Sequence, residues 1–255
     1  MRFASLGSGS RGNGTLIAAG ATTVLVDCGF PLRETERRLA RLEMAAPDLA
    51  AILVTHEHGD HHSGVGMLAR RYGIPVWLTP GTRRAGAQEL GELPRVNEFS
   101  CHAPFAIGDL QVEPLAVPHD AREPSQFVFG DGVRRLGVVT DVGRPTPFLC
   151  QRLSGCDALM LEFNHDEAML ANGEYPPQLK KRVGGDQGHL SNRQAADLLA
   201  RIDRGRMQHF VAAHLSEKNN RPALVRVAAA AVLGCEEAWI GVADQALGLP
   251  WREIL

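Results

Sequence analysis

The sequence has little lysine, no closely paired cysteines and no long apolar run. Three of its 27 basic residues are lysines and the formal net charge is −2, so the composition gives no global electrostatic signal for nucleic acid. The five cysteines are odd in number and form no C-x-x-C pair, which indicates reduced thiols. No stretch is apolar for long enough to cross a bilayer, and residues 1–8 lack the apolar core of a signal peptide. We therefore expect a soluble, cytoplasmic protein without a membrane partner.

A dense cluster of metal-ligating side chains follows one of the short apolar runs. Residues 55–61 have the sequence Thr-His-Glu-His-Gly-Asp-His, which is the pattern H-x-H-x-D-H. His56 and His58 are two residues apart, so an extended segment turns both to one side. Asp60 and His61 follow where the chain bends and can face a second ion. Imidazole nitrogen with carboxylate oxygen is the donor set of metals that activate water, so the segment predicts most of a two-metal site.

Short β-rich runs and helical stretches alternate along the whole chain. The expected strands are Arg2–Leu6, Thr15–Ala18, Thr22–Val26, Ala50–Val54, Val76–Leu78, Leu110–Val117, Gln126–Phe129, Leu136–Thr140, Ala158–Leu161, Phe210–Ala213 and Ala238–Gly241. The expected helices lie after Pro31 and over Gly64–Tyr72, Pro147–Leu153, Asn192–Ile202 and Arg221–Leu233. This alternation indicates an α/β fold of two mixed sheets with helices on their outer faces. No linker interrupts it, so we expect one domain over residues 1–255.

Four polar residues stand directly after apolar strands: Asp27, His119, Asp141 and His214. Functional side chains gather at such positions because the sheet holds the following loop rigidly. Taken singly, each residue is equally well explained as a turn or a cap. Together with the histidine cluster, however, they supply the ligands that the cluster lacks.

The expected ligands form two groups of three with one shared carboxylate. They are His56, His58 and His119 for one ion, Asp60, His61 and His214 for the other, and Asp141 between the two. A carboxylate can bridge because it has two oxygens and neutralises both cations. Asp27 is expected to orient a ligand imidazole through its free N–H. The histidines expected to lie outside the site are His62, His102 and His209.

The order D…HxHxDH…H…D…H on this strand pattern resembles the metallo-β-lactamase superfamily, whose fold is a four-layer αββα sandwich. Further segments are similar to its YycJ/WalJ-type branch: Ser8–Asn13, Glu162–Asp166, Gly188–Asn192, and Ala213–Ser216 with the Asn219-Asn220 pair. The resemblance covers essentially the whole chain. It implies a metal-dependent DNA exonuclease that acts from a 5′ end, with two divalent ions, Zn²⁺ or Mn²⁺, as cofactors.

The resemblance also suggests how the reaction proceeds. A hydroxide that bridges the two ions is expected to attack phosphorus. Glu162 and His189 resemble the Glu–His pair of tRNA 3′-processing relatives, and His189 would protonate the leaving oxygen. We expect these two residues and Asp60 to be catalytic. The expected contacts to substrate or to ligands are Asp27, His165, Ser10 and Asn13. Ser10 and Asn13 belong to the glycine-rich turn at residues 8–13, which offers backbone N–H groups to a phosphate. Binding of a substrate phosphate and bonding to nearby backbone explain His165 equally well.

Other functions use the same ligands. A phosphodiesterase for small cyclic phosphates differs only in its substrate. A thioester hydrolase like glyoxalase II holds glutathione with a helical C-terminal segment, for which the expected strand Ala238–Gly241 leaves little room. A sensor that has lost its metals is disfavoured by the complete ligand set. Antibiotic hydrolysis is disfavoured because the commonest β-lactamases are exported and have Cys at the position of Asp141.

Overall fold

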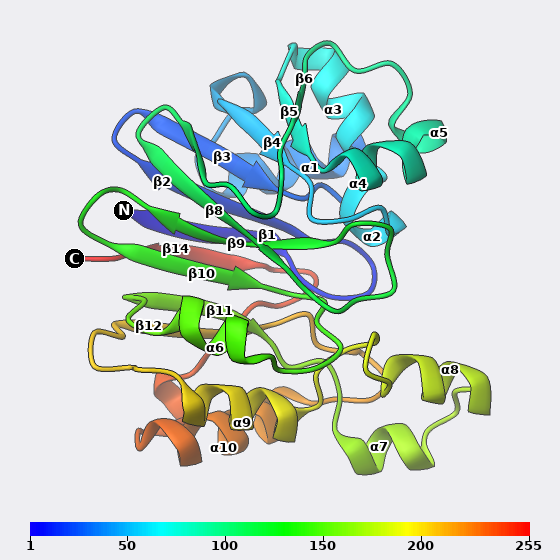
Figure 1. Cartoon of the computed structure of the whole chain (residues 1–255), viewed down its shortest axis with the longest axis vertical. Helices are drawn as coiled ribbons and strands as arrows, with labels where there is room; N and C mark the ends of the chain where they lie inside the picture. Colours follow the sequence, from blue (N-terminus) through cyan, green and yellow to red (C-terminus); the bar gives the residue numbers. More distant parts are fainter.

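The computed structural model describes residues 1–255 and contains two seven-stranded sheets stacked face to face (Figure 1). The first sheet has the strand order β14 (Leu249–Glu253), β1 (Arg2–Gly7), β2 (Gly14–Ala19), β3 (Thr22–Val26), β4 (Ala51–Leu53), β5 (Val76–Leu78) and β6 (Val96–Glu98). The second has the order β13 (Gly241–Val242), β12 (His209–Ala213), β11 (Ala158–Glu162), β10 (Arg135–Val139), β9 (Ser125–Gly130), β8 (Leu110–Ala116) and β7 (Phe105–Ile107). Strands β3–β6 run parallel to one another, as do β10–β13, and the other pairs are antiparallel.

Helices cover the outer faces of both sheets. The first half of the chain contains α1 (Leu32–Arg41), η1 (Ala46–Asp48), α2 (Gly59–His62), α3 (Val65–Tyr72), α4 (Pro80–Ala85) and α5 (Ala87–Leu90). The second half contains α6 (Pro147–Leu153), α7 (Glu167–Asn172), α8 (Pro177–Val183), α9 (Asn192–Arg201), α10 (Pro222–Leu233) and η2 (Glu237–Trp239). Figure 1 shows α1 and α3 on one side of the sandwich and α6, α9 and α10 on the other, with α7 and α8 at one end.

Three apolar layers hold the four layers of secondary structure together. Because side chains alternate along a strand, Ala158 and Met160 of β11 point into the core between the sheets, whereas Leu159 and Leu161 point to the helices behind. The outer face of the first sheet packs in the same way against α1 and α3. This arrangement confirms the predicted αββα sandwich. None of its helices is both long enough and apolar enough to span a membrane.

The C-terminal region differs from the prediction. The expected strand Ala238–Gly241 is wrong, because residues 237–239 form the turn of η2 and only Gly241 and Val242 pair with β12. The side chain of Trp239 is half exposed, so the apolar run reflects a surface turn and not a buried strand. The last strand, β14, was not predicted. It contains Pro250 and lies at the edge of the first sheet, where a missing N–H costs no ladder hydrogen bond.

Candidate metal centre

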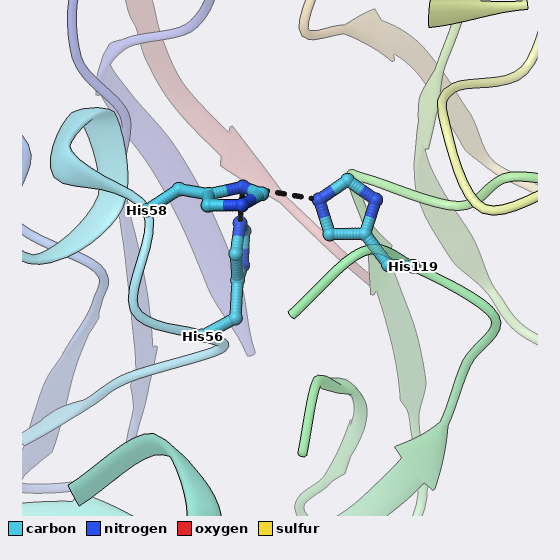
Figure 2. A group of neighbouring side chains, drawn as sticks. All are labelled: His56, His58 and His119. Carbon is cyan, nitrogen blue, oxygen red and sulfur yellow. Dashed lines mark hydrogen bonds between the residues drawn. The ribbon is translucent and has the colours of Figure 1, made fainter. Parts of the chain in front are cut away.

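The first three histidines come from loops of both sheets. Strand β4 ends at Leu53 and leads to His56 and His58, whereas His119 follows β8 of the facing sheet. The Nε2 of His56 and the Nε2 of His119 lie 2.9 Å and 3.2 Å, respectively, from the Nδ1 of His58 (Figure 2). The stacking of the two sheets therefore directs three imidazole nitrogens toward one point.

The second group lies beside the first. The Oδ2 of Asp60 is 3.3 Å from the Nε2 of His214 and 3.5 Å from the Nε2 of His61. Asp141 lies between the groups: its Oδ2 is 3.1 Å from the Nε2 of His61 and its Oδ1 is 3.9 Å from the Nε2 of His119. All seven side chains proposed from the sequence as ligands thus converge in one place.

Unusual backbone conformations position three of the strand-end residues. Asp27, Asp141 and His214 have φ angles of 60°, 47° and 54°, in the left-handed region that side chains other than glycine rarely adopt. Such conformations cost of order 1–3 kcal/mol each and persist only where the surroundings enforce them. Close packing adds a second constraint, because a Cβ on Gly29 would clash with the backbone carbonyl of Asp60. The site is therefore built at the expense of local backbone stability.

Asp27 and Thr55 form a hydrogen-bonded support beneath the ligands. The Oδ2 of Asp27 is 2.8 Å from the Nδ1 of His61, and it accepts a bond from the Thr55 hydroxyl, whose oxygen is 2.9 Å from the Nδ1 of His56. The Thr55 N–H donates to the Oδ1 of Asp27. These contacts leave the Nε2 atoms of both imidazoles directed into the site. Sequence reasoning assigned this role to Asp27 but missed Thr55, whose position before His56 was its only signal.

A buried glutamate supports the opposite wall. The Oε1 of Glu162 lies 2.7 Å from the Nδ1 of His189 and 3.1 Å from the Nδ1 of His214. Its Oε2 accepts bonds from the backbone N–H groups of Val142 and Leu190. The pairing of Glu162 with His189 was expected, whereas its contact with His214 was not. Glu162 therefore orients two imidazoles at once.

The electrostatics of the site favour positive charge. Burial raises the pKa of the Asp60 carboxyl and of the Asp141 carboxyl, but the neighbouring His61 and His214 outweigh it and lower both pKa values. Burial lowers the pKa of His214, but Asp141 and Asp60 raise it to about 10. The pKa of His61 is likewise raised well above its ordinary value, mainly by Asp141 and Asp60. The carboxylates around His61 and His214 thus favour positive charge at this position.

The donors present fit divalent cations. The Oδ2 of Asp141 is buried and accepts no hydrogen bond, a costly arrangement unless a cation meets the oxygen. Ligand atoms of the seven side chains and of Glu162 and His189 fall into groups in which all lie within 4.8 Å of one another. None of the five free cysteines belongs to these groups. Nitrogen and oxygen donors without thiolates suit zinc, manganese and similar ions.

A cavity of about 360 Å³, which we call the central cavity, opens over the ligands. Ser10, an expected substrate contact, lies in its wall. The wall also contains Tyr175 from the α7–α8 loop, and Leu179 and Arg182 from α8. Sequence reasoning missed these three residues because no motif marks the segment and only the fold brings it over the ligands.

The glycine-rich turn supports the ligands from the other side. The Nδ2 of Asn13 is 3.1 Å from the Nε2 of His61 and 3.2 Å from the carbonyl oxygen of Asp60. The hydroxyl of Ser8 accepts a bond from the backbone N–H of His214 and donates to the Oδ1 of Asn13. Through Asn13 and Ser8, the turn thus links the loop of Asp60 and His61 to the loop of His214.

The remaining histidines lie apart from the ligand groups. His165 is absent from the wall of the central cavity, where its neighbour Asn164 is found instead. His62 ends α2, and its Nε2 lies 3.0 Å from a carboxylate oxygen of Glu89. The Nε2 of His209 is 2.7 Å from the carbonyl oxygen of Glu253, and His102 is an exposed turn residue.

Comparisons with known proteins agree with this geometry. A family model described as a beta-lactamase superfamily domain matches residues 22–214. The chain is 36% identical to Exodeoxyribonuclease YycJ of Bacillus anthracis, over 96% of this chain and 92% of that protein. It is 31% identical to Exodeoxyribonuclease WalJ of Streptococcus pneumoniae, over 94% and 91% of the two chains. The crystal structure of Zn²⁺-bound PqqB from Methylobacterium extorquens has a TM-score of 0.75 at 18% identity, covering 99% of this chain and all of that one.

Replacing Thr55 by valine should weaken the binding of divalent metal ions. Valine has nearly the same shape but removes the hydroxyl that contacts His56 and Asp27. We expect the dissociation constant for Zn²⁺ to rise about 10–100-fold, as for other residues that orient metal ligands. Competition with a chromogenic chelator measures it. Thr23→Val, on the partly buried surface of β3, is the matched control, and equal affinities of the two variants would exclude a positioning role for Thr55.

Proposed function

Because the chain belongs to the metallo-β-lactamase superfamily, and within it to the group of YycJ and WalJ, we propose that it is a metal-dependent DNA exonuclease acting in the 5′-to-3′ direction. Two relatives named as exodeoxyribonucleases match more than nine-tenths of the chain. The observation that carries the proposal is the convergence of six nitrogen and oxygen ligands around Asp141, one oxygen of which accepts no hydrogen bond. Phosphodiester hydrolysis is the chemistry that such paired sites support.

The chain offers ligands for two ions. One group is His56, His58 and His119, and the other is Asp60, His61 and His214, with Asp141 between them. Bound divalent ions, Zn²⁺ or Mn²⁺, would supply Lewis acidity toward the phosphate and lower the pKa of a nucleophilic water. Asp60 adds a negative charge at the edge of the central cavity, where it counters the buried imidazoles.

His189 is the residue placed to protonate the leaving oxygen. Its Nδ1 is held by the carboxylate of Glu162, so its Nε2 is the nitrogen that remains to meet the substrate in the central cavity. Burial lowers the pKa of His189, but the charges of Glu162 and Asp141 outweigh it and raise the pKa above its ordinary value. A protonated imidazole can therefore donate a proton from Nε2 to the departing alkoxide while Glu162 keeps the ring in place.

Two alternative substrates follow from the shared ligand set. Small cyclic phosphodiesters need the same ligands and would enter the central cavity without contacting the protein outside it. Glutathione thioesters are the second alternative, because their hydrolysis uses the same ligands.

The proposed activity predicts release of nucleotides from linear DNA. With Mn²⁺ or Zn²⁺, we expect the protein to degrade linear DNA from the 5′ end faster than it degrades RNA, cyclic nucleotides or a glutathione thioester. The measurement is product analysis with substrates labelled at either end. If the protein hydrolyses a cyclic nucleotide but does not cleave DNA, the nuclease proposal is wrong and the protein is a phosphodiesterase for small substrates.

Replacing His189 by alanine should reduce cleavage of DNA about 10²–10⁴-fold, the usual contribution of a general acid. It should reduce hydrolysis of bis(p-nitrophenyl) phosphate much less, because a nitrophenolate leaves without being protonated. Metal content is measured on the same samples. His102→Ala, at an exposed turn, is the control. Full activity toward DNA would remove His189 from the reaction, and loss of bound metal would make it a ligand instead.

A further inference from the structure

A second cavity lies on the other side of helix α8 from the central cavity. It has a volume of about 430 Å³, and we call it the α8 cavity. Its wall includes His165, Lys180, Lys181, Gly184 and Arg193. No residue proposed as a metal ligand lines it. The hollow therefore has no part in the site described above.

Helix α8 separates the two cavities. Residues Leu179, Arg182 and Val183 face the central cavity, and they are spaced three and four apart, as residues on one helix face are. Lys180 and Lys181 face the α8 cavity. A further hollow of about 450 Å³ lies next to both, because it shares Arg182 with the central cavity and Lys181 with the α8 cavity. Three hollows thus follow one another around a single helix.

The buried wall of the α8 cavity contains an unsatisfied imidazole. His165 has 2% of its surface exposed, and its Nδ1 is buried without a hydrogen-bond partner. Its Nε2 lies on the side of Gly184, where a Cβ would be 3.9 Å from it. Burial lowers the pKa of His165, which favours the neutral ring. A buried polar atom without a partner is uncommon in folded proteins. The Nε2, on the side of Gly184 in the cavity wall, is the ring nitrogen that a ligand in the cavity would meet.

The charged groups around His165 favour an anion. Lys181 is exposed and forms no ion pair or hydrogen bond within the chain. Lys180 donates to the carbonyl oxygen of Ala171, and Arg193 pairs with Glu167 at 2.9 Å. The three cations outnumber the one carboxylate in the wall. The chain has only three lysines, so two of the three lie at this cavity.

The third lysine, Lys218, lies near the central cavity, 3.6 Å from a carboxylate oxygen of Glu174. The ammonium of Lys218 is 5.9 Å from the ring centre of Tyr175, which lines the central cavity. Lysine is thus confined to the surroundings of α8 in a chain whose other 24 basic residues are arginines (27 − 3). A compact ammonium on a flexible stem suits phosphates whose positions vary along a strand.

We propose that the α8 cavity binds a phosphodiester group of the polynucleotide outside the cleavage site, through Lys181 and Arg193 with His165 behind them. The inference rests on the proposed nuclease function and names the path of its substrate. Three neighbouring hollows around α8 favour a linear polymer, because a small phosphodiester would fill only the central cavity. The strand would pass from the ligands around α8 and place one of its phosphates in the α8 cavity.

The test compares a long and a small substrate on the same variants. Lys181→Gln should raise the KM for a single-stranded oligonucleotide about fivefold more than the KM for bis(p-nitrophenyl) phosphate, since one exposed charge pair is lost. For the oligonucleotide, the slope of a plot of log KM against log salt concentration should be smaller by about one in Lys181→Gln than in the unaltered protein. Lys181→Arg, which keeps the charge, should restore both values. Arg33→Gln, an exposed cation on α1 without an ion pair, is the matched control.

The outcomes separate this inference from the function on which it rests. The KM ratio is the KM for the oligonucleotide divided by the KM for bis(p-nitrophenyl) phosphate. The inference alone would be overturned if the unaltered protein cleaves oligonucleotides and Lys181→Gln and Arg33→Gln have equal KM ratios and equal salt dependence. Absence of any polynucleotide cleavage by the unaltered protein would overturn the proposed function. Arg193→Gln provides a second variant, and it should shift the KM ratio in the same direction as Lys181→Gln. Competition by inorganic phosphate that is equally strong against both substrates would place the anion in the central cavity and also contradict the inference.

Discussion

The buried carboxylate of Asp141 is the group on which the organisation of the centre depends. It stands between two groups of ligands, each drawn from loops of both sheets, and one of its oxygens accepts no hydrogen bond. A buried negative charge of this kind is stable only when positive charge surrounds it. In the protein, the imidazoles of His61 and His214 lie beside it, and the surrounding carboxylates raise the pKa values of both rings. The same carboxylates make the centre a favourable environment for divalent cations.

The sandwich provides the rigidity that such a charge arrangement requires. The ligands come from loops of both sheets, so their relative positions depend on the apolar layer between the sheets. Asp27 and Glu162 then hold the imidazoles from opposite walls, at distances of 2.7–3.1 Å. Left-handed backbone at Asp27, Asp141 and His214 turns the chain abruptly at the end of each strand. The core thus offsets the local cost of the strained loops.

The part of the site that could be predicted is the part that local sequence encodes. The H-x-H-x-D-H segment follows a strand and bends immediately. Asp27, Asp141 and His214 each follow a short apolar run, so their positions depend only on where strands end. Tyr175 and Arg182 could not be found in this way, because they reach the central cavity only through the placement of α8. His165 was expected near the reacting groups, but a single residue step along the loop carries it to the other side of α8.

The central claim is that two ions occupy the centre with Asp141 between them. Anomalous diffraction from crystals grown with Mn²⁺, together with elemental analysis of the same protein, tests it most directly. The account predicts two anomalous peaks, one beside His56, His58 and His119 and the other beside Asp60, His61 and His214, each within coordination distance of Asp141. A single peak, or none, with His119 or His214 turned away from the centre, would contradict it.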